Sequence, residues 1–239
     1  MNFVSGSTSE EKRLVKGIQN AVGAYADNSI GPVTLIDIAA KVNADCFPLA
    51  VKLYENPSIV CKDILVFNPR AGLTNYTNSI SGSFSYQQKP CSILINKGTP
   101  VCSAACHAWL KKPESVLYCL KDGTFGIKRC LSASELPINI KWAIGGMGLL
   151  DLYSPATEGF SGTYADVLRL TDHTMIGVKG SLIYLSLCKN MTGAQVNAYA
   201  KKMNFEKAIM LDGGHVAAMN SAAAKYHTTQ VQYYAIQAV

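Results

Sequence analysis

Asp212 is the residue of this sequence that is best placed to do chemistry. It follows a short apolar run at 208–211 and precedes Gly213 and Gly214, so a buried strand would deliver a carboxylate beside open space. Two glycines permit positive φ and let backbone N–H groups approach an anion. His215 comes next and could act as an acid or base, or contact a phosphate. A tight turn with a hydrogen-bonded aspartate and histidine is the plainer alternative.

Two other stretches carry polar side chains between apolar neighbours. Asn43 and Asp45 lie just before Pro48, which suggests a strand end facing a cleft, or equally a plain turn. Glu158 lies in the stretch 154–165, which is rich in small residues, glycine and proline. We interpret that stretch as a loop, either a lid over a site or an exposed connection.

The charge pattern narrows the class of partner. The formal net charge is +6, from 22 basic and 16 acidic residues, but the basic residues are scattered in ones and twos. No basic helix or aromatic-interleaved stripe is present, so nucleic-acid binding is not expected. A mild positive field suits a small anionic substrate. The sequence does not indicate an oligomeric state.

Location is inferred from the N-terminus and from the apolar runs. Residues 1–11 are polar and acidic, unlike an export signal, and no apolar run is long enough to span a bilayer. We therefore expect a soluble, cytoplasmic protein without membrane contact. A bacterial, viral or phage protein would have the same sequence features.

The eight cysteines are expected to be reduced thiols rather than disulfides, because no export signal precedes them. Cys102, Cys106, His107, Cys119 and Cys130 could form a zinc site, but their spacing is not a standard ligand pattern. Buried free thiols are the alternative, and no cofactor is expected. A divalent metal remains open, since strand-end aspartates can also be metal ligands.

Local signals predict several elements. Apolar residues at helical spacing and an acidic first turn predict an N-terminal amphipathic helix within 7–25. Capping boxes predict a short helix at 34–40 and a helix that begins after Thr192, with Gln195 at its third position. The Asp-Gly pair at 122–123 predicts a tight hairpin turn.

Apolar runs bounded by turn residues predict the strands. They lie at 64–67, 80–86, 92–95, 116–120, 125–129, 175–178, 181–188, 208–211 and within 230–239. We predict an α+β fold with a mixed, largely antiparallel sheet and packed helices in a single domain. Residues 1–30 would be a helical extension and residues 31–239 the main domain.

Four segments, in order, resemble the phosphodiester glycosidase family, which includes the enzyme that removes N-acetylglucosamine to uncover mannose 6-phosphate tags. The stretch 42–47 is similar to its strand ending in an Asn-Gly-(small)-Phe-Phe type of motif, and 142–146 to its central glycine-bearing strand. The stretch 172–178 is similar to its Arg-Thr-Ala-Ile-Gly motif, and 211–214 to its Asp-Gly-Gly-Gly-Ser motif.

The resemblance implies a hydrolase that cleaves the glycosidic bond of a sugar phosphodiester or a related anionic sugar phosphate. Asp212 would be the catalytic carboxylate, with Asp45 and His215 as further catalytic candidates. A departing phosphate needs little acid catalysis, so the site must mainly hold the anion and stabilise an oxocarbenium-like sugar. The expected substrate-binding residues are Asn43, Gly145, Gly146, Glu158, Arg169, His173, Thr174, Gly213 and Gly214.

Two departures from the family pattern motivate an alternative. His173 stands where the family has an arginine, with Arg169 four residues earlier as a substitute, and the serine after the glycines is missing. The alternative is an inactive member that binds or sequesters a small anionic ligand, or serves as a structural component of a particle.

Overall fold

The chain divides into two compact units, Met1–Asn56 and Pro57–Val239. The structure is a computed structural model that describes residues 4–5, 8–22, 29–30, 56–69, 72–87, 89–222, 224–226 and 234–239. The expectation of a single domain is therefore not confirmed. The boundary expected at residue 30 stays a prediction, because residues 31–55 lie outside the described ranges.

The first unit contains the predicted N-terminal helix. This helix, α1 (Ser9–Val22), begins after Thr8, whose N–H donates to Glu11 Oε2 at 3.0 Å, while Glu11 N–H donates to Thr8 Oγ1 at 3.2 Å. This reciprocal capping satisfies two N–H groups that a helix start leaves unpaired. Strands β1 (Val4–Ser5) and β2 (Ser29–Ile30) pair antiparallel. The short helix predicted at 34–40 lies outside the described residues.

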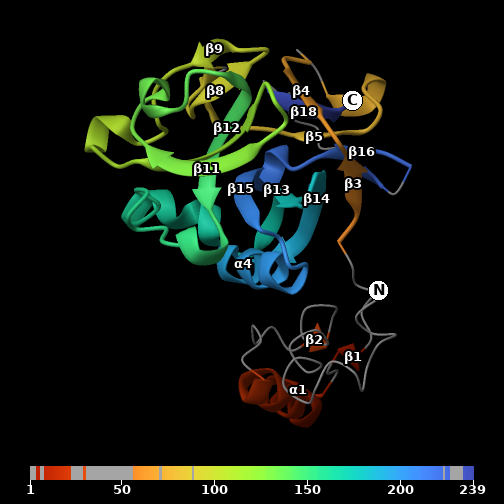
Figure 1. Ribbon diagram of the computed structural model, residues 1–239. Helices are drawn as coiled ribbons and strands as arrows, with labels where there is room; N and C mark the ends of the chain where they lie inside the picture. The colour runs from red at the N-terminus through yellow and green to blue at the C-terminus, as the bar shows by residue number, and fades with distance from the viewer. Residues whose placement is uncertain are drawn as a thin grey trace. The chain divides into compact units, whose positions relative to one another are not determined.

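The second unit is built on a nine-stranded sheet in which every pairing is antiparallel (Figure 1). Its strand order is β11-β10-β12-β15-β13-β14-β3, with β8 pairing β12 and β9 pairing β8. The strands are β3 (Ser58–Cys61), β8 (Leu94–Asn96), β9 (Thr99–Cys102), β10 (Glu114–Leu120), β11 (Phe125–Cys130), β12 (Ile140–Gly148), β13 (Thr171–Lys179), β14 (Leu182–Met191) and β15 (Lys207–Gly213).

A smaller five-stranded sheet packs against the large one. Its order is β17-β16-β5-β18-β4, from strands β4 (Ile64–Phe67), β5 (Ser79–Ser81), β16 (Met219–Asn220), β17 (Lys225–Tyr226) and β18 (Ala235–Ala238). A two-stranded hairpin, β6 (Ser85–Tyr86) and β7 (Lys89–Pro90), follows β5. Strand β18 confirms the last strand predicted within 230–239.

One hydrophobic core joins the two sheets. It contains Ile80 and Ile236 from the small sheet together with Leu117, Ile176 and Leu211 from the large sheet, all at most 1% exposed. Burying each such side chain contributes about 1.5–3 kcal/mol relative to leaving it in water. The ends of β5 and β15 are therefore held close to one another by packing.

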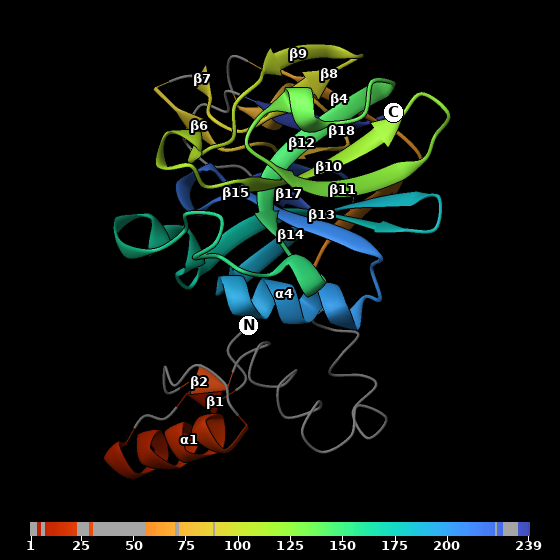
Figure 2. The same cartoon turned by 60° about the vertical axis from the view of Figure 1, so that its left-hand side comes forward.

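Helix α4 (Gly193–Lys202) covers the other face of the large sheet, where it contacts β14 and β15 (Figure 2). Thr192 caps it as predicted, since Thr192 Oγ1 accepts from Gln195 N–H and Gln195 Oε1 accepts from Thr192 N–H. The unit thus has three layers: small sheet, large sheet and α4. The fold is broadly α+β, as predicted, with strands dominant.

Short 3-10 helices fill the connections: η2 (Leu73–Asn75), η3 (Ala108–Leu110), η4 (Ala133–Glu135), η5 (Leu150–Leu152), η6 (Gly162–Leu168) and η7 (Gly214–Val216). The predicted hairpin is confirmed, with β10 and β11 joined across residues 121–124. Within the described ranges, no helix combines the length and the hydrophobicity needed to span a bilayer.

Candidate functional site

The end of β15 is fixed at the meeting point of the two sheets. Leu211 is fully buried, whereas Asp212 is half-buried. The buried Thr174 on β13 donates its hydroxyl to Asp212 O at 2.8 Å and to Ser81 O at 3.3 Å. Asp212 N–H donates to Gly82 O at 3.3 Å. Hydrogen bonds to β13 and to the end of β5 therefore hold the Asp212 backbone in place.

The Asp212 carboxyl group is held by backbone donors. Its Oδ1 accepts the N–H of Gly213 at 2.9 Å, and the carboxyl also accepts the N–H of Ser85 on β6. Burial is the main cause that raises the pKa of Asp212 to about 7; the nearby Asp166 carboxylate also raises it, and the two backbone hydrogen bonds lower it. No ion pair to Asp212 occurs among the described residues. Protonated and ionised forms therefore coexist near neutral pH.

A small cavity of about 70 Å³ lies at this strand end. Gly214 has φ of +62° and a Cβ built there would lie 3.2 Å from Arg169 Nη2, so the guanidinium closely approaches the glycine turn. Arg169 is 52% exposed in its side chain and pairs with Asp166, 3.6 Å away. The lining residues are Asp166, Val167, Arg169, Thr171, His173, Leu211, Asp212, Gly213 and Gly214.

The structure thus brings together five of the expected site residues: Asp212, Gly213, Gly214, Arg169 and His173. Typical small-molecule sites measure about 300–1,000 Å³, so this cavity could hold only one small group of a larger ligand. An anionic group would meet the Arg169 guanidinium there, and a carboxyl that changes charge near neutral pH. That is a suitable arrangement for acid–base or nucleophilic chemistry beside an anion.

His173 is part of the wall of this cavity and is only 1% exposed. Its Nε2 lies 2.8 Å from Met191 O and 3.2 Å from Arg169 O. Because both partners are carbonyl oxygens, Nε2 carries the proton and donates. Burial lowers the pKa of His173, so the imidazole is neutral near pH 7. His173 holds the Arg169 and Met191 segments together and adds no positive charge for an anion.

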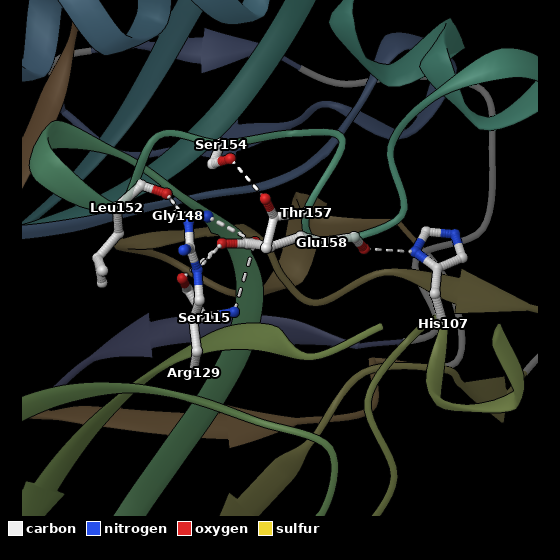
Figure 3. Close-up of polar contacts among 8 residues, drawn as sticks. All are labelled: His107, Ser115, Arg129, Gly148, Leu152, Ser154, Thr157 and Glu158. Carbon is white, nitrogen blue, oxygen red and sulfur yellow. Dashed lines mark hydrogen bonds and ion pairs between the residues drawn. The ribbon is translucent and has the colours of Figure 1, made fainter. Parts of the chain in front are cut away.

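Glu158 is buried in a polar network (Figure 3) and does not line this cavity. Its side chain is 0% exposed, and its Oε1 accepts from Arg129 Nε at 2.9 Å and from Ser115 Oγ at 2.8 Å. Its Oε2 accepts the N–H of Gly148 at 3.0 Å, and Arg129 also donates to Leu152 O. Glu158 therefore anchors the 154–161 turns to β10, β11 and β12 instead of facing a ligand.

Gly145 and Gly146 allow close packing in β12. A Cβ at Gly145 would lie 2.2 Å from Glu114 Oε1, and a Cβ at Gly146 would lie 2.5 Å from Met210 O. Both glycines are buried, and neither lines the cavity at Asp212. The space that their missing side chains leave is filled by the protein itself.

The remaining expected site residues have separate positions. His215 is exposed on η7, directly after the glycine turn. Asn43 and Asp45 lie outside the described residues, so their proposed roles stay predictions. In the described ranges, no group of three or more histidine, cysteine, aspartate or glutamate side chains could hold a metal ion.

Sequence reasoning missed Glu114 and Asp166. Glu114 is 1% exposed, and burial raises its pKa to about 8. Its position as a charged residue at the start of the apolar strand 114–120 could have indicated that this carboxyl is buried. Asp166 precedes Arg169 by three residues, a spacing at which opposite charges meet on a helical turn.

Comparison with known proteins supports the fold. No protein-family model matches the sequence, and no curated protein matches it. Among solved structures, the pro-peptide-inhibited catalytic domain of zebrafish N-acetylglucosamine-1-phosphodiester alpha-N-acetylglucosaminidase is similar, with a TM-score of 0.52 and 17% identity over 73% of this chain and 72% of that chain. A hypothetical Synechocystis protein has a TM-score of 0.44 and 10% identity, covering 75% of this chain and 56% of that chain. The zebrafish likeness shows a shared fold with a phosphodiester glycosidase catalytic domain.

Proposed function

We propose that this chain is a hydrolase that cleaves the glycosidic bond of a sugar phosphodiester or a related anionic sugar phosphate. Asp212 would be the catalytic carboxylate. The proposal rests on the protonation and surroundings of the Asp212 carboxyl. This half-buried group lies at a strand end, has no ion-pair partner in the described ranges and has a pKa of about 7. An arginine, Arg169, lines the same cavity. The fold shared with a phosphodiester glycosidase catalytic domain is consistent with the proposal.

The charges around the cavity suggest separate roles for Arg169 and Asp212. Arg169 would attract the phosphate, since its guanidinium is half-exposed and its carboxylate partner, Asp166, is also at the surface. A phosphate released from a sugar is already a stable anion, so the site needs no strong acid for the leaving group. Catalysis then depends on stabilising the positive charge that develops on the sugar.

The ionised form of Asp212 would act on the sugar. It either attacks the anomeric carbon or takes a proton from the attacking water, and both routes require the carboxylate form. A pKa of about 7 leaves a substantial fraction ionised at neutral pH and keeps the group basic enough to accept a proton. The backbone donors of Gly213 and Ser85 would hold the reacting oxygen in one orientation. His215, exposed beside the turn, would contact the substrate outside the small cavity.

Product analysis tests this proposal. Wild type and Asp212→Asn are incubated with a panel of sugar phosphodiesters and nucleotide sugars, with and without a chelator, and the products are identified by mass spectrometry. Asp122→Asn is the matched control, because Asp122 is an aspartate in the exposed turn between β10 and β11. We expect free sugar from wild type and Asp122→Asn only, and chelator sensitivity would reveal a required metal.

A different result would favour the alternative, an inactive protein that binds a small anionic ligand. If no panel member is cleaved but one is retained by wild type and Asp212→Asn alike, the hydrolase proposal is wrong. The chain would then be a receptor that sequesters a small anion on this fold.

A further inference from the structure

Two cysteine side chains from separate segments lie in contact. Cys91 follows β7, and Cys106 precedes η3, yet their sulfur atoms are only 3.6 Å apart. Both side chains are half-buried, and neither is bonded to another cysteine. A disulfide needs a sulfur–sulfur distance of about 2.05 Å, so the two sulfurs must approach by only about 1.5 Å. Side-chain rotation can supply a movement of that size.

Glu114 holds the two segments in this arrangement. Its Oε1 accepts the N–H of Ile93, two residues after Cys91, at 2.5 Å. Its Oε2 accepts the N–H of Cys106 itself at 3.1 Å. The carboxyl is almost fully buried, and Gly145 leaves the space that it occupies. The thiol pair is thus positioned by a buried clamp rather than by chance contact of surface loops.

The same pair adjoins the hairpin that contacts Asp212. Cys91 N–H donates to Phe84 O at 3.0 Å, directly beyond the pairing of Ser85 with Pro90. Ser85 N–H in turn donates to the Asp212 carboxyl. A covalent bond at Cys91 would therefore restrict the base of the hairpin whose other strand supplies a hydrogen bond to Asp212.

We propose that Cys91 and Cys106 are a reversible dithiol–disulfide couple that ties the β6–β7 hairpin to the segment before η3. The oxidant is a small-molecule disulfide such as oxidised glutathione. The thiolate of one cysteine attacks the glutathione disulfide, forms a mixed disulfide and expels one glutathione thiolate. The second cysteine then attacks the protein sulfur of the mixed disulfide and expels the other. The two thiol protons end on two glutathione molecules, so atoms and electrons balance.

The environment of Cys106 makes its thiol slow to react. The hydrogen bond with Cys91 and burial both raise the pKa of Cys106, so this thiol keeps its proton near neutral pH. Oxidation should be slow near neutral pH and faster at higher pH, because the thiolate is the attacking species.

Intact-mass measurement and peptide mapping test the proposal on the full chain. Wild type is incubated with oxidised glutathione at pH 7 and pH 9. We expect a loss of about 2 Da per chain, one linked peptide pair containing residues 91 and 106, and reversal by dithiothreitol. Amide hydrogen exchange of residues 84–86 should slow on oxidation. These readouts do not require turnover, so the result stands apart from the hydrolase proposal.

Three variants give the controls. Cys91→Ser and Cys106→Ser should each lose the internal bond, and Cys106→Ser should accumulate a mixed disulfide with glutathione at Cys91. Cys61→Ser removes another half-buried thiol, on β3, and should form the 91–106 bond as wild type does. The proposal is overturned if wild type links Cys91 or Cys106 to Cys102 or any other cysteine. It is also overturned if wild type forms only a stable mixed disulfide.

Discussion

Glu158 and Asp212 are both acidic side chains that the sequence marks as site candidates, but their surroundings are opposite. Glu158 is 0% exposed and accepts hydrogen bonds from Arg129, Ser115 and Gly148. Asp212 is half-buried, accepts only backbone N–H groups in the described ranges, and borders a cavity that also holds the half-exposed Arg169.

The difference shows what separates a structural carboxylate from a reactive one. When protein donors occupy both oxygens and a guanidinium balances the charge, no lone pair is left for a substrate. A carboxyl that is shielded from water and has no ion-pair partner has a raised pKa. It can therefore gain or lose a proton near neutral pH.

The largest effect is expected for Asp212→Asn. The amide keeps the shape but cannot act as a base or nucleophile, so turnover should fall by about 10²–10⁴-fold. The variant should be at least as stable as wild type at pH 8, because it removes the cost of an ionised buried carboxyl. Steady-state kinetics and urea unfolding measure the two effects, and retained turnover would remove Asp212 from the catalytic role.

Glu158→Gln should instead lower the stability of the fold and leave turnover nearly unchanged. Breaking the buried pair leaves Arg129 without its carboxylate, which we expect to lower the free energy of unfolding by about 2–4 kcal/mol. The activity of the molecules that stay folded should change less than twofold. Urea unfolding gives the first quantity, and kinetics at low temperature, normalised to the folded fraction, gives the second. A selective loss of turnover at unchanged stability would show that Glu158 acts on the substrate.

The raised pKa of Glu114 predicts that the free energy of unfolding depends on pH. Its pKa is raised from 4.5 to about 8 in the folded chain, so between these values the folded state binds more protons than the unfolded state. The stabilisation is fully present below pH 4.5 and is lost as pH rises through about 8, an effect on the order of 5 kcal/mol. Asp212, raised from 3.8 to about 7, adds a change of the same sign.

Unfolding of wild type and Glu114→Gln between pH 4 and pH 9 tests this effect. The glutamine variant should have a lower starting stability, because it loses one acceptor for a buried N–H, and a flatter pH profile. Equal slopes for the two proteins would show that folding does not raise the pKa of Glu114.

The smallest effect is expected for Asp166→Asn. Asp166 competes with an incoming anion for Arg169 and also helps to raise the pKa of Asp212. Both partners are at the surface, so the change should be small: KM about two- to fivefold lower, with kcat nearly unchanged. Kinetics at low and high salt measure it, and the gain should shrink as salt increases. A higher KM would mean that Asp166 itself binds the substrate.

Much of the fold could be predicted from local patterns. The capping box at Thr192, the Asp-Gly turn at 122–123 and the apolar run before Asp212 each specify an element through residues that are neighbours in sequence. The division of the strands into two sheets could not be predicted, because the pairing of β5 with β16 and β18 joins segments far apart in the chain. No local signal encodes such pairings.

The candidate site was predictable in the same partial way. Residues near the end of one strand, such as Asp212 and Gly214, can be found from sequence, and Arg169 was found through the resemblance. The burial of Glu158, and the carbonyl partners that keep His173 neutral, depend on residues from other strands. Substrate contacts were therefore expected of Glu158 from its residue type and of His173 from the resemblance, although the protein already uses the polar atoms of both side chains.

The pH dependence of kcat/KM for sugar release tests directly whether Asp212 is the catalytic carboxylate. If the ionised form of Asp212 acts on the sugar, kcat/KM should rise with pH through a midpoint near 7, the pKa to which burial raises this group. His215→Gln should keep the same midpoint, which excludes the exposed histidine as its source. A flat profile between pH 5 and pH 9, or a midpoint that disappears in His215→Gln, would contradict the assignment of Asp212 as the catalytic carboxylate.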